Sequence, residues 1–395
     1  MGMVDIIKKD DEFIIKLKGR IDSKNSGDCD KAIFDELNES SITKIKIDMD
    51  ELEYISSAGL RILMKIAKQN QERLTISNVN RDIYDILEMT GFTELFDVNR
   101  KLRNISVDGC EIIGQGANGA VYRLDADTVI KVYQPGTPIE DVNRERNLAH
   151  AAFVKGIPTA ISYDVVNVED KLGIVFELLN AQSLSSVIDE NPERFDELAQ
   201  KYVDTYKAFH TKTDDKNEFP KVKDIYNIYI DGIVDWYTED EIKKLRELVA
   251  SVPERNTLIH GDFHAHNIMY AENELIMIDM GDVSVGHPIF DFLATASTQA
   301  NLVDLNPEYA QIHTGMKVEY IKKLWNTLLR LYFDGKSDEE IALLDKQIRL
   351  MSKLKVAFAP VIARGIPMEL IQSSVDDAKI NLIPHIDELI GKIDW

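Results

Sequence analysis

Two short segments hold the side chains best suited to chemistry. The run His260–Asn267 (HGDFHAHN) contains an aspartate and, five residues later, an asparagine; Asp279 follows twelve residues further on, at the end of an apolar run. Phosphoryl transfer needs one carboxylate to orient the acceptor hydroxyl, and an amide with a second carboxylate to hold the magnesium that bridges the phosphates. The order and spacing of these residues therefore indicate a phosphoryl-transfer enzyme.

A glycine-rich segment upstream can cover phosphates. The pattern GxGxxG in 111–122 is weak evidence alone, because dinucleotide-binding folds, kinases and ordinary turns share it. Here a strand follows it, 120–124, which turns at 125–127 into a second strand, 129–133, whereas a dinucleotide fold would open a helix. Ala120 also stands where a P-loop requires lysine. We therefore expect a kinase-type glycine flap, with Lys131 gripping the phosphates beneath the backbone of Gly114, Gly116, Ala117, Asn118 and Gly119.

Two further segments complete the predicted nucleotide site. The periodicity of 139–153 predicts a helix, and Glu145 on it is the expected ion-pair partner of Lys131. The apolar strand 173–179 should lead into the hinge between two lobes, where the backbone from Glu177 to Leu179 would contact adenine. The alternative for that strand is a buried strand with one carboxylate at its rim.

Residues 108–395 resemble the aminoglycoside phosphotransferase and choline kinase-like family. The resemblance rests on His260-Gly261-Asp262 with Asn267, on 278–282 (IDMGD) and on the Gly-x-Pro-x-x-Asp turn at 286–291. It implies an α+β bilobal protein kinase-like fold, with an N-lobe over 108–180 and a helical C-lobe over 181–395 that shapes the acceptor site. By this resemblance ATP is the donor, Asp262 is the catalytic base, Asn267 and Asp279 bind Mg²⁺, and Asp291 braces the loop. His260 is expected to be structural.

Other histidines are expected to have no catalytic role. His264 and His266 lack the carboxylate or cysteine neighbours of a metal site. His210 lies at the end of a predicted helix, 195–210, where a histidine more often caps or packs.

Residues 1–98 predict a small α/β domain, because strands and helices alternate along them. This segment resembles the STAS domain of bacterial anti-sigma-factor antagonists, through 17–23 (LKGRIDS), the strand 45–48 and the loop 52–61 (LEYISSAGLR). Residues 99–107 are a charged connector with no obvious core face. The resemblance implies a possible protein partner for this domain.

Two serines in the STAS-like segment are candidate phosphoacceptors. In the family a serine that opens this helix is phosphorylated, and alignment on Gly59-Leu60 makes Ser57 the matching position, with Ser56 before it. A phosphate there would meet free N–H groups and the positive end of the helix dipole. The alternative is that either serine simply caps the helix.

Composition limits the partners and the location. The net charge of −22 disfavours nucleic acid and anionic membranes, and would attract a cationic acceptor. The expected C-terminal helical stretches 316–333, 337–359 and 375–390 carry many acids, which could line a site for an amine or could be solvated faces. No secretory signal or membrane-length apolar run is visible, and two cysteines make no disulfide framework, so we expect a cytoplasmic protein.

Three functions remain open from the sequence. The first is ATP- and magnesium-dependent transfer of phosphate to a hydroxyl of a small molecule, aminoglycoside-like or choline-like. The second is a serine protein kinase that acts on Ser57 of its own or a partner's STAS domain. The third is a nucleotide-sensing adaptor. The sequence distinguishes neither ATP from GTP nor one acceptor from another.

Overall fold

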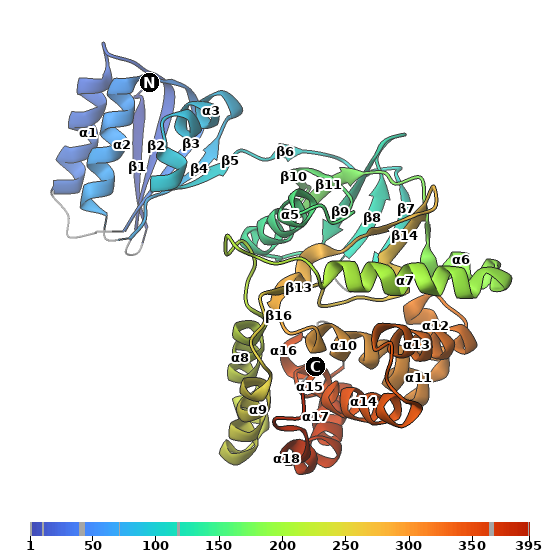
Figure 1. Ribbon diagram of the computed structural model, residues 1–395. Helices are drawn as coiled ribbons and strands as arrows, with labels where there is room; N and C mark the ends of the chain where they lie inside the picture. Colours follow the sequence, from blue (N-terminus) through green and yellow to red (C-terminus); the bar gives the residue numbers. More distant parts are fainter. Residues whose placement is uncertain are drawn as a thin grey trace. The chain divides into compact units, whose positions relative to one another are not determined.

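The computed structural model describes residues 2–9, 12–38, 44–70, 72–116, 119–362, 367–393 and 395. They belong to two compact units, Met1–Asn104 and Ile105–Trp395, which Figure 1 shows with most of their helices and strands labelled. Within the described part of the chain, no helix combines the length and the apolar character needed to cross a membrane.

The first unit is a five-stranded sheet with helical connections, which confirms the predicted α/β class. An antiparallel hairpin is extended by three parallel strands, in the order β1-β2-β3-β4-β5. Parallel neighbours need crossover connections, and helices supply them here. The strands are β1 (Val4–Lys9), β2 (Glu12–Ile21), β3 (Lys44–Ile55), β4 (Thr75–Val79) and β5 (Asp97–Arg100); the helices are α1 (Ser26–Asn38), α2 (Ser57–Gln69), α3 (Arg81–Met89) and α4 (Phe92–Leu95).

The core of this unit follows from the two-residue period of its strands. Phe13, Ile15 and Leu17 of β2 are buried, and the residues between them are only partly buried. Helices α1 and α2 lie side by side against the sheet and cover this apolar face (Figure 1). Burial of alternate residues therefore fixes the strand register. Helix α2 begins two residues after β3 ends.

The expected connector is shorter and less isolated than the sequence suggested. Strand β5 includes Asn99 and Arg100, so the sheet of the first unit reaches into the segment 99–107. Ile105 and Val107 are partly buried against the apolar cluster around Ile130 in the second unit. The expectation of no core face was wrong, because two alternating apolar residues in a charged run are too short a signal.

The N-lobe of the second unit is an antiparallel sheet with one long helix. The strand order β10-β11-β9-β8-β7 places the glycine-rich strands at one side and β9 in the middle. Helix α5 (Ile139–Val154) packs against β10 and β11 (Figure 1). The strands are β7 (Glu111–Gly116), β8 (Gly119–Arg123), β9 (Thr128–Tyr133), β10 (Ser162–Val168) and β11 (Lys171–Glu177).

The C-lobe is mainly helical, which confirms the predicted bilobal α+β architecture. Short strands, β12 (Gln182–Ser183), β13 (Thr257–Ile259), β14 (Ile268–Ala271), β15 (Glu274–Met277) and β16 (Ser284–Gly286), frame the loops of the site. The helices are α6 (Leu184–Glu190), α7 (Phe195–Phe209), α8 (Val222–Gly232), α9 (Glu239–Ser251), α10 (Ile289–Ala296), α11 (Leu302–Leu305), α12 (Pro307–Thr314), α13 (Val318–Tyr332), α14 (Asp338–Met351), α15 (Lys353–Ala357), α16 (Ala359–Ile362), α17 (Met368–Asn381) and α18 (Ile386–Leu389).

Two long helices expected near the C-terminus are interrupted. The stretch 337–359 begins with a capping box of Ser337 and Glu340, but α14 ends at Met351 and α15 begins at Lys353. At the break the hydroxyl of Ser352, fully buried, donates to the carbonyl of Arg349 at 2.8 Å. The stretch 375–390 likewise spans the end of α17, a 3-10 turn and α18.

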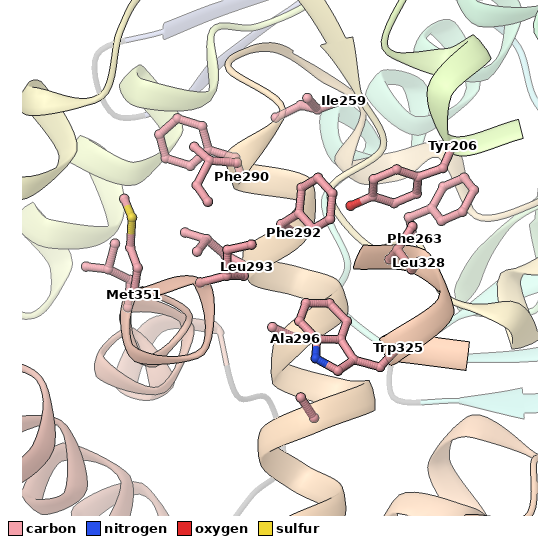
Figure 2. Packing of buried hydrophobic residues seen from close by; sticks show 14 of the residues in the cluster. Tyr206, Ile259, Phe263, Phe290, Phe292, Leu293, Ala296, Trp325, Leu328 and Met351 are labelled. Carbon is pink, nitrogen blue, oxygen red and sulfur yellow. The ribbon is translucent and has the colours of Figure 1, made fainter. Parts of the chain in front are cut away.

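An aromatic core anchors the loop between β13 and β14. The ring of Phe263 in this loop lies 4.5 Å from that of Tyr206 on α7, and Tyr206 lies 5.1 Å from Phe292 on α10 (centroid distances; Figure 2). Trp325 of α13 packs on the same cluster. Because Phe263 follows Asp262 directly, burial of its ring holds the neighbouring carboxylate in place.

Candidate active site

The loop that carries Asp262 is held by one buried carboxylate. Asp291, at the start of α10, is fully buried and accepts the backbone N–H of His260 at 2.8 Å and that of Gly261 at 2.5 Å. Its Oδ2 also lies 3.0 Å from Nε2 of His210. The structure thus places Asp291 beneath the loop, in contact with the backbone of His260. His210 does pack at the end of α7, but it also belongs to this network, a contact that the sequence analysis missed.

Gly261 is required by both its backbone conformation and its surroundings. Its φ of +84° lies in the left-handed region, and a Cβ there would stand 2.7 Å from the carbonyl oxygen of Asp282. Any larger residue at this position would push the loop away from 280–282.

Asp262 is partly buried and lies among polar groups. The Nδ2 of Asn267 is 3.1 Å from its Oδ2, and Nε2 of His264 is 3.4 Å from the same oxygen. Burial alone would raise the pKa of Asp262, but the charge and hydrogen bond of His264, helped by Lys355, hold it below the usual value. The carboxylate is therefore ionised at neutral pH and can accept a hydrogen bond from a hydroxyl.

Lys131 lies between two carboxylates from distant elements. Its Nζ is 2.8 Å from Oε1 of Glu145 on α5 and 2.9 Å from Oδ1 of Asp279. The ion pair that the sequence predicted with Glu145 is therefore present. Burial by itself would lower the pKa of Lys131, but these two carboxylates raise it above the ordinary lysine value, so the amine stays charged.

Asn267 and Asp279 lie at the same end of the β14–β15 hairpin. Ile268 pairs with Met277, and the N–H of Ile278 donates to the carbonyl of Asn267 at 2.9 Å, which brings the two side chains to neighbouring positions. The amide nitrogen of Asn267 binds Asp262, so its Oδ1 is the atom that could meet a cation. Asp279, with φ of +59° and a partly exposed side chain, offers a carboxylate.

Asn267 and Asp279 would suit a magnesium ion that is also bound by phosphates, rather than a metal held by protein ligands alone. Mg²⁺ is usually bound by one or two carboxylates together with substrate phosphates. Among the residues that the structure describes, no group of three or more His, Cys, Asp or Glu side chains could hold a metal by itself, including the group around His264 and His266.

The glycine flap is formed by β7 and β8. Gly114 and Gly116 lie in β7, and Gly119 begins β8, while Ala117 and Asn118 lie outside the described residues. A Cβ on Gly119 would stand 1.9 Å from the carbonyl oxygen of Val132, so only glycine allows β8 to pair with β9 here.

The predicted hinge follows β11 directly. The N–H of Leu178 donates to the carbonyl of Asp127 at 2.7 Å, and Oε1 of Glu177 accepts the N–H of Ile161 at 2.8 Å. The Glu177 side chain thus bonds within the N-lobe. The backbone N–H of Glu177 also donates to the carbonyl of Ile161 at 3.0 Å, so an adenine contact at this residue would have to use its carbonyl.

A model of the phosphotransferase enzyme family matches residues 109–313, a little over half of the chain. The chain belongs to this family. A model of the STAS domain matches residues 3–105, so this phosphotransferase carries an N-terminal STAS domain.

Individual relatives of the STAS part and of the phosphotransferase part are distant. A Bordetella bronchiseptica protein described as a putative anti-sigma factor antagonist, BtrV, is 28% identical over 94 residues, which cover 23% of this chain and 80% of that protein. The ADP-bound crystal structure of aminoglycoside phosphotransferase APH(2'')-Ib aligns at 15% identity and a TM-score of 0.48, over 78% of this chain and 98% of that one. A choline/ethanolamine kinase family protein from Mesorhizobium loti aligns at 12% identity and a TM-score of 0.43, over 71% and 92%.

In the STAS domain of this phosphotransferase, the two candidate serines have different roles at the start of α2. Ser56 is the N-cap of α2, and its hydroxyl accepts the N–H of Gly59 at 3.4 Å. Ser57 is the first helical residue, and it is exposed. Capping therefore falls to Ser56, and Ser57 presents its hydroxyl to solvent.

The acids of the C-terminal helices are engaged in local contacts. Asp338 pairs with Arg330 at 2.8 Å, Glu340 accepts the N–H of Ser337 at 2.8 Å, and Asp377 accepts from Lys353 at 2.8 Å. These contacts account for Asp338, Glu340 and Asp377 without an amine-bearing acceptor.

Two basic groups lie near Asp262 that sequence reasoning did not assign to the site. The ring of His313 on α12 is 5.9 Å from that of His264, and Nζ of Lys355 on α15 is 3.3 Å from the carbonyl oxygen of Gly261. No local signal marks either residue, because each joins the site through a distant helix.

Proposed function

We propose that this phosphotransferase moves the γ-phosphoryl group of ATP to a hydroxyl of a small molecule. The observation that supports this most is the convergence of Lys131, Asn267 and Asp279 with Asp262. Cation, amide and carboxylates are the groups that phosphoryl transfer requires, and here they come from both lobes.

Each group has a role in the proposed reaction. Asp262 accepts the proton of the acceptor hydroxyl while the hydroxyl oxygen forms the new bond to phosphorus. The bond from the γ-phosphorus to the bridging oxygen breaks, and ADP leaves with that electron pair. Lys131, fixed by Glu145, binds the phosphates. Asn267 and Asp279 would hold Mg²⁺, which supplies neutralising charge to the phosphates when bound.

A second candidate function is supported by the exposure of Ser57. The hydroxyl of this serine is free of the capping role taken by Ser56, and a phosphate on it would stand at the N-terminus of α2. In this alternative the chain is a serine protein kinase that acts on its own or a partner's STAS domain.

One reaction distinguishes the candidates. The full chain is incubated with γ-labelled ATP and Mg²⁺, with GTP in parallel, and both label on the chain and ADP release are measured across a panel of amines, sugars and sugar alcohols. Small-molecule transfer predicts acceptor-stimulated ADP release and no label. The protein-kinase alternative predicts label that Ser57→Ala abolishes and Ser56→Ala retains. Tight nucleotide binding with neither result would favour the adaptor.

The catalytic role of Asp262 is tested in the same assay. We expect Asp262→Asn to lower turnover by roughly 10²- to 10⁴-fold, the usual range for a general base, while nucleotide affinity stays within a few-fold. Turnover that survives this change would contradict the proposed mechanism, whichever acceptor is used.

A further inference from the structure

Lys355 reaches the catalytic loop from a part of the chain beyond the family match. That match ends at residue 313, and Lys355 lies on α15, the short helix that follows the break at Ser352. Its Nζ donates to the carbonyl oxygen of Gly261 at 3.3 Å, across 94 residues of sequence. A C-terminal helix thus contacts the backbone next to Asp262.

With this contact, both polar groups of the peptide unit between Gly261 and Asp262 have a hydrogen-bond partner. The peptide between Gly261 and Asp262 has two polar ends: the N–H of Asp262 lies 3.3 Å from Nδ1 of His260, and the carbonyl of Gly261 meets Lys355. The N–H of Gly261 itself donates to Asp291.

Such fixing matters because of the glycine. A residue without Cβ visits many backbone conformations, so the peptide after Gly261 can rotate more freely than one after any other residue. Rotation of this unit would turn the Cα of Asp262 and displace its carboxylate. Displacements of about 1 Å at a reacting group can cost on the order of 10²-fold in rate.

The charge of Lys355 also acts on the site. Burial alone would lower the pKa of Lys355, but the negative charges of the nearby Asp282 and Asp262 carboxylates raise it above the ordinary value. The amine therefore stays protonated next to the catalytic base, and its charge favours the ionised form of Asp262.

We propose that Lys355 is a positioning residue of the phosphoryl-transfer reaction, which holds the Gly261–Asp262 peptide in the orientation that presents the Asp262 carboxylate. This inference rests on the proposed function, because it assigns Lys355 a role in that reaction.

The same helix offers a matched control. Lys353, two residues earlier on α15, pairs with Asp377 of α17 at 2.8 Å. Removing its charge changes α15 and its packing, but not the contact with the catalytic loop.

The test compares Lys355→Met, Lys355→Arg and Lys353→Met in the full chain. Three quantities are measured: ADP release with saturating Mg·ATP and water as acceptor, the Kd of Mg·ATP by calorimetry, and the unfolding midpoint. We expect Lys355→Met to lower kcat at least about tenfold, with the nucleotide Kd within about twofold of the parent. Lys355→Arg should restore most of the rate, and Lys353→Met should leave it unchanged.

Two other results would have different meanings. If the parent chain neither binds nor turns over nucleotide, the proposed function fails, whatever Lys355 does. If the parent turns over and a folded Lys355→Met keeps the same kcat, the role of Lys355 is wrong.

A second variant serves if Lys355→Met fails to fold. Lys355→Leu also removes both the donor and the charge, with a side chain of different shape, and it is measured in the same assay. A folded Lys355→Leu with a kcat lowered at least about tenfold, and a Kd of Mg·ATP within about twofold of the parent, would support the positioning role. A folded Lys355→Leu with the kcat of the parent would overturn that role.

Discussion

Asp291 and His210 lie in direct contact in the interior of the C-lobe, with Oδ2 and Nε2 3.0 Å apart. His210 continues the network, since its Nδ1 is 2.9 Å from the hydroxyl of Tyr332 on α13. One carboxylate therefore joins the ends of α7 and α10 to the backbone of the loop that carries Asp262, and a side chain from α13 completes the arrangement.

Removal of this carboxylate should unfold the loop and weaken the C-lobe. Asp291→Ala leaves two backbone N–H groups and His210 buried without their acceptor, and we expect a loss of about 3–5 kcal/mol in the free energy of unfolding. Urea denaturation followed by tryptophan fluorescence measures it. The control is Asp196→Ala, whose side chain is 91% exposed and should change stability by less than about 0.5 kcal/mol. Equal effects of the two changes would contradict the bracing role.

Lys131 should determine nucleotide affinity as well as rate. Lys131→Met removes the charged donor that would bind the phosphates, and we expect the Kd of Mg·ATP to rise about 10- to 100-fold. Isothermal titration calorimetry measures the change. Lys171→Met, in β11 of the same lobe, removes an equal charge outside the site and should leave the Kd unchanged. Unaltered affinity in Lys131→Met would remove this lysine from the nucleotide site.

Two glycines with similar φ values should lose different amounts of stability when replaced by alanine. Gly109 has φ of +75° and open space where a Cβ would stand, whereas Gly261 has φ of +84° and the Asp282 carbonyl within 2.7 Å of that position. Gly109→Ala should cost about 1–2 kcal/mol through backbone strain alone. Gly261→Ala should cost roughly 1–3 kcal/mol more, because the loop must also move away from Asp282. Thermal unfolding of both variants provides the comparison, and equal losses would mean that the close approach is relieved without cost.

The buried ring of His287 should make the free energy of unfolding depend on pH. Its Nδ1 accepts the N–H of Ile289 at 3.1 Å, and its Nε2 faces the carbonyl of Trp395 at 2.9 Å, so the buried ring is bonded as the neutral form. Burial lowers the pKa of His287 to about 4, below the value near 6.5 of an unfolded chain. The stabilisation is thus complete above about pH 6.5 and is lost as the pH falls toward 4, by up to roughly 3 kcal/mol.

The measurement is a difference between variants. The free energy of unfolding of the parent relative to His287→Gln should shrink between pH 7 and pH 4, because only the parent takes up a proton at this ring when it unfolds in that range. A pH-independent difference for His287→Gln would contradict the assignment.

Much of this protein could be read from local patterns. The α/β order of the first unit, the glycine hairpin with Lys131 and the loop from His260 to Asn267 follow from alternation, turn residues and fixed spacing, which act over a few residues. The pairing of Lys131 with Glu145 could also be predicted from the sequence, because the two residues lie on a strand and on the helix that follows it directly. The breaks in the C-terminal helices were not, since Ser352 interrupts an amphipathic pattern that continues on either side.

The sequence by itself determined which chemical groups are available and which elements carry them, because those depend on residue type and on neighbours along the chain. Only the tertiary structure decided that His210 meets Asp291 and that Lys355 meets Gly261, pairs that are 81 and 94 residues apart. Such contacts depend on how helices pack around the aromatic core, and packing is set by the shapes of many side chains together. Folding therefore supplies the loop around Asp262 with contacts that no local pattern identifies.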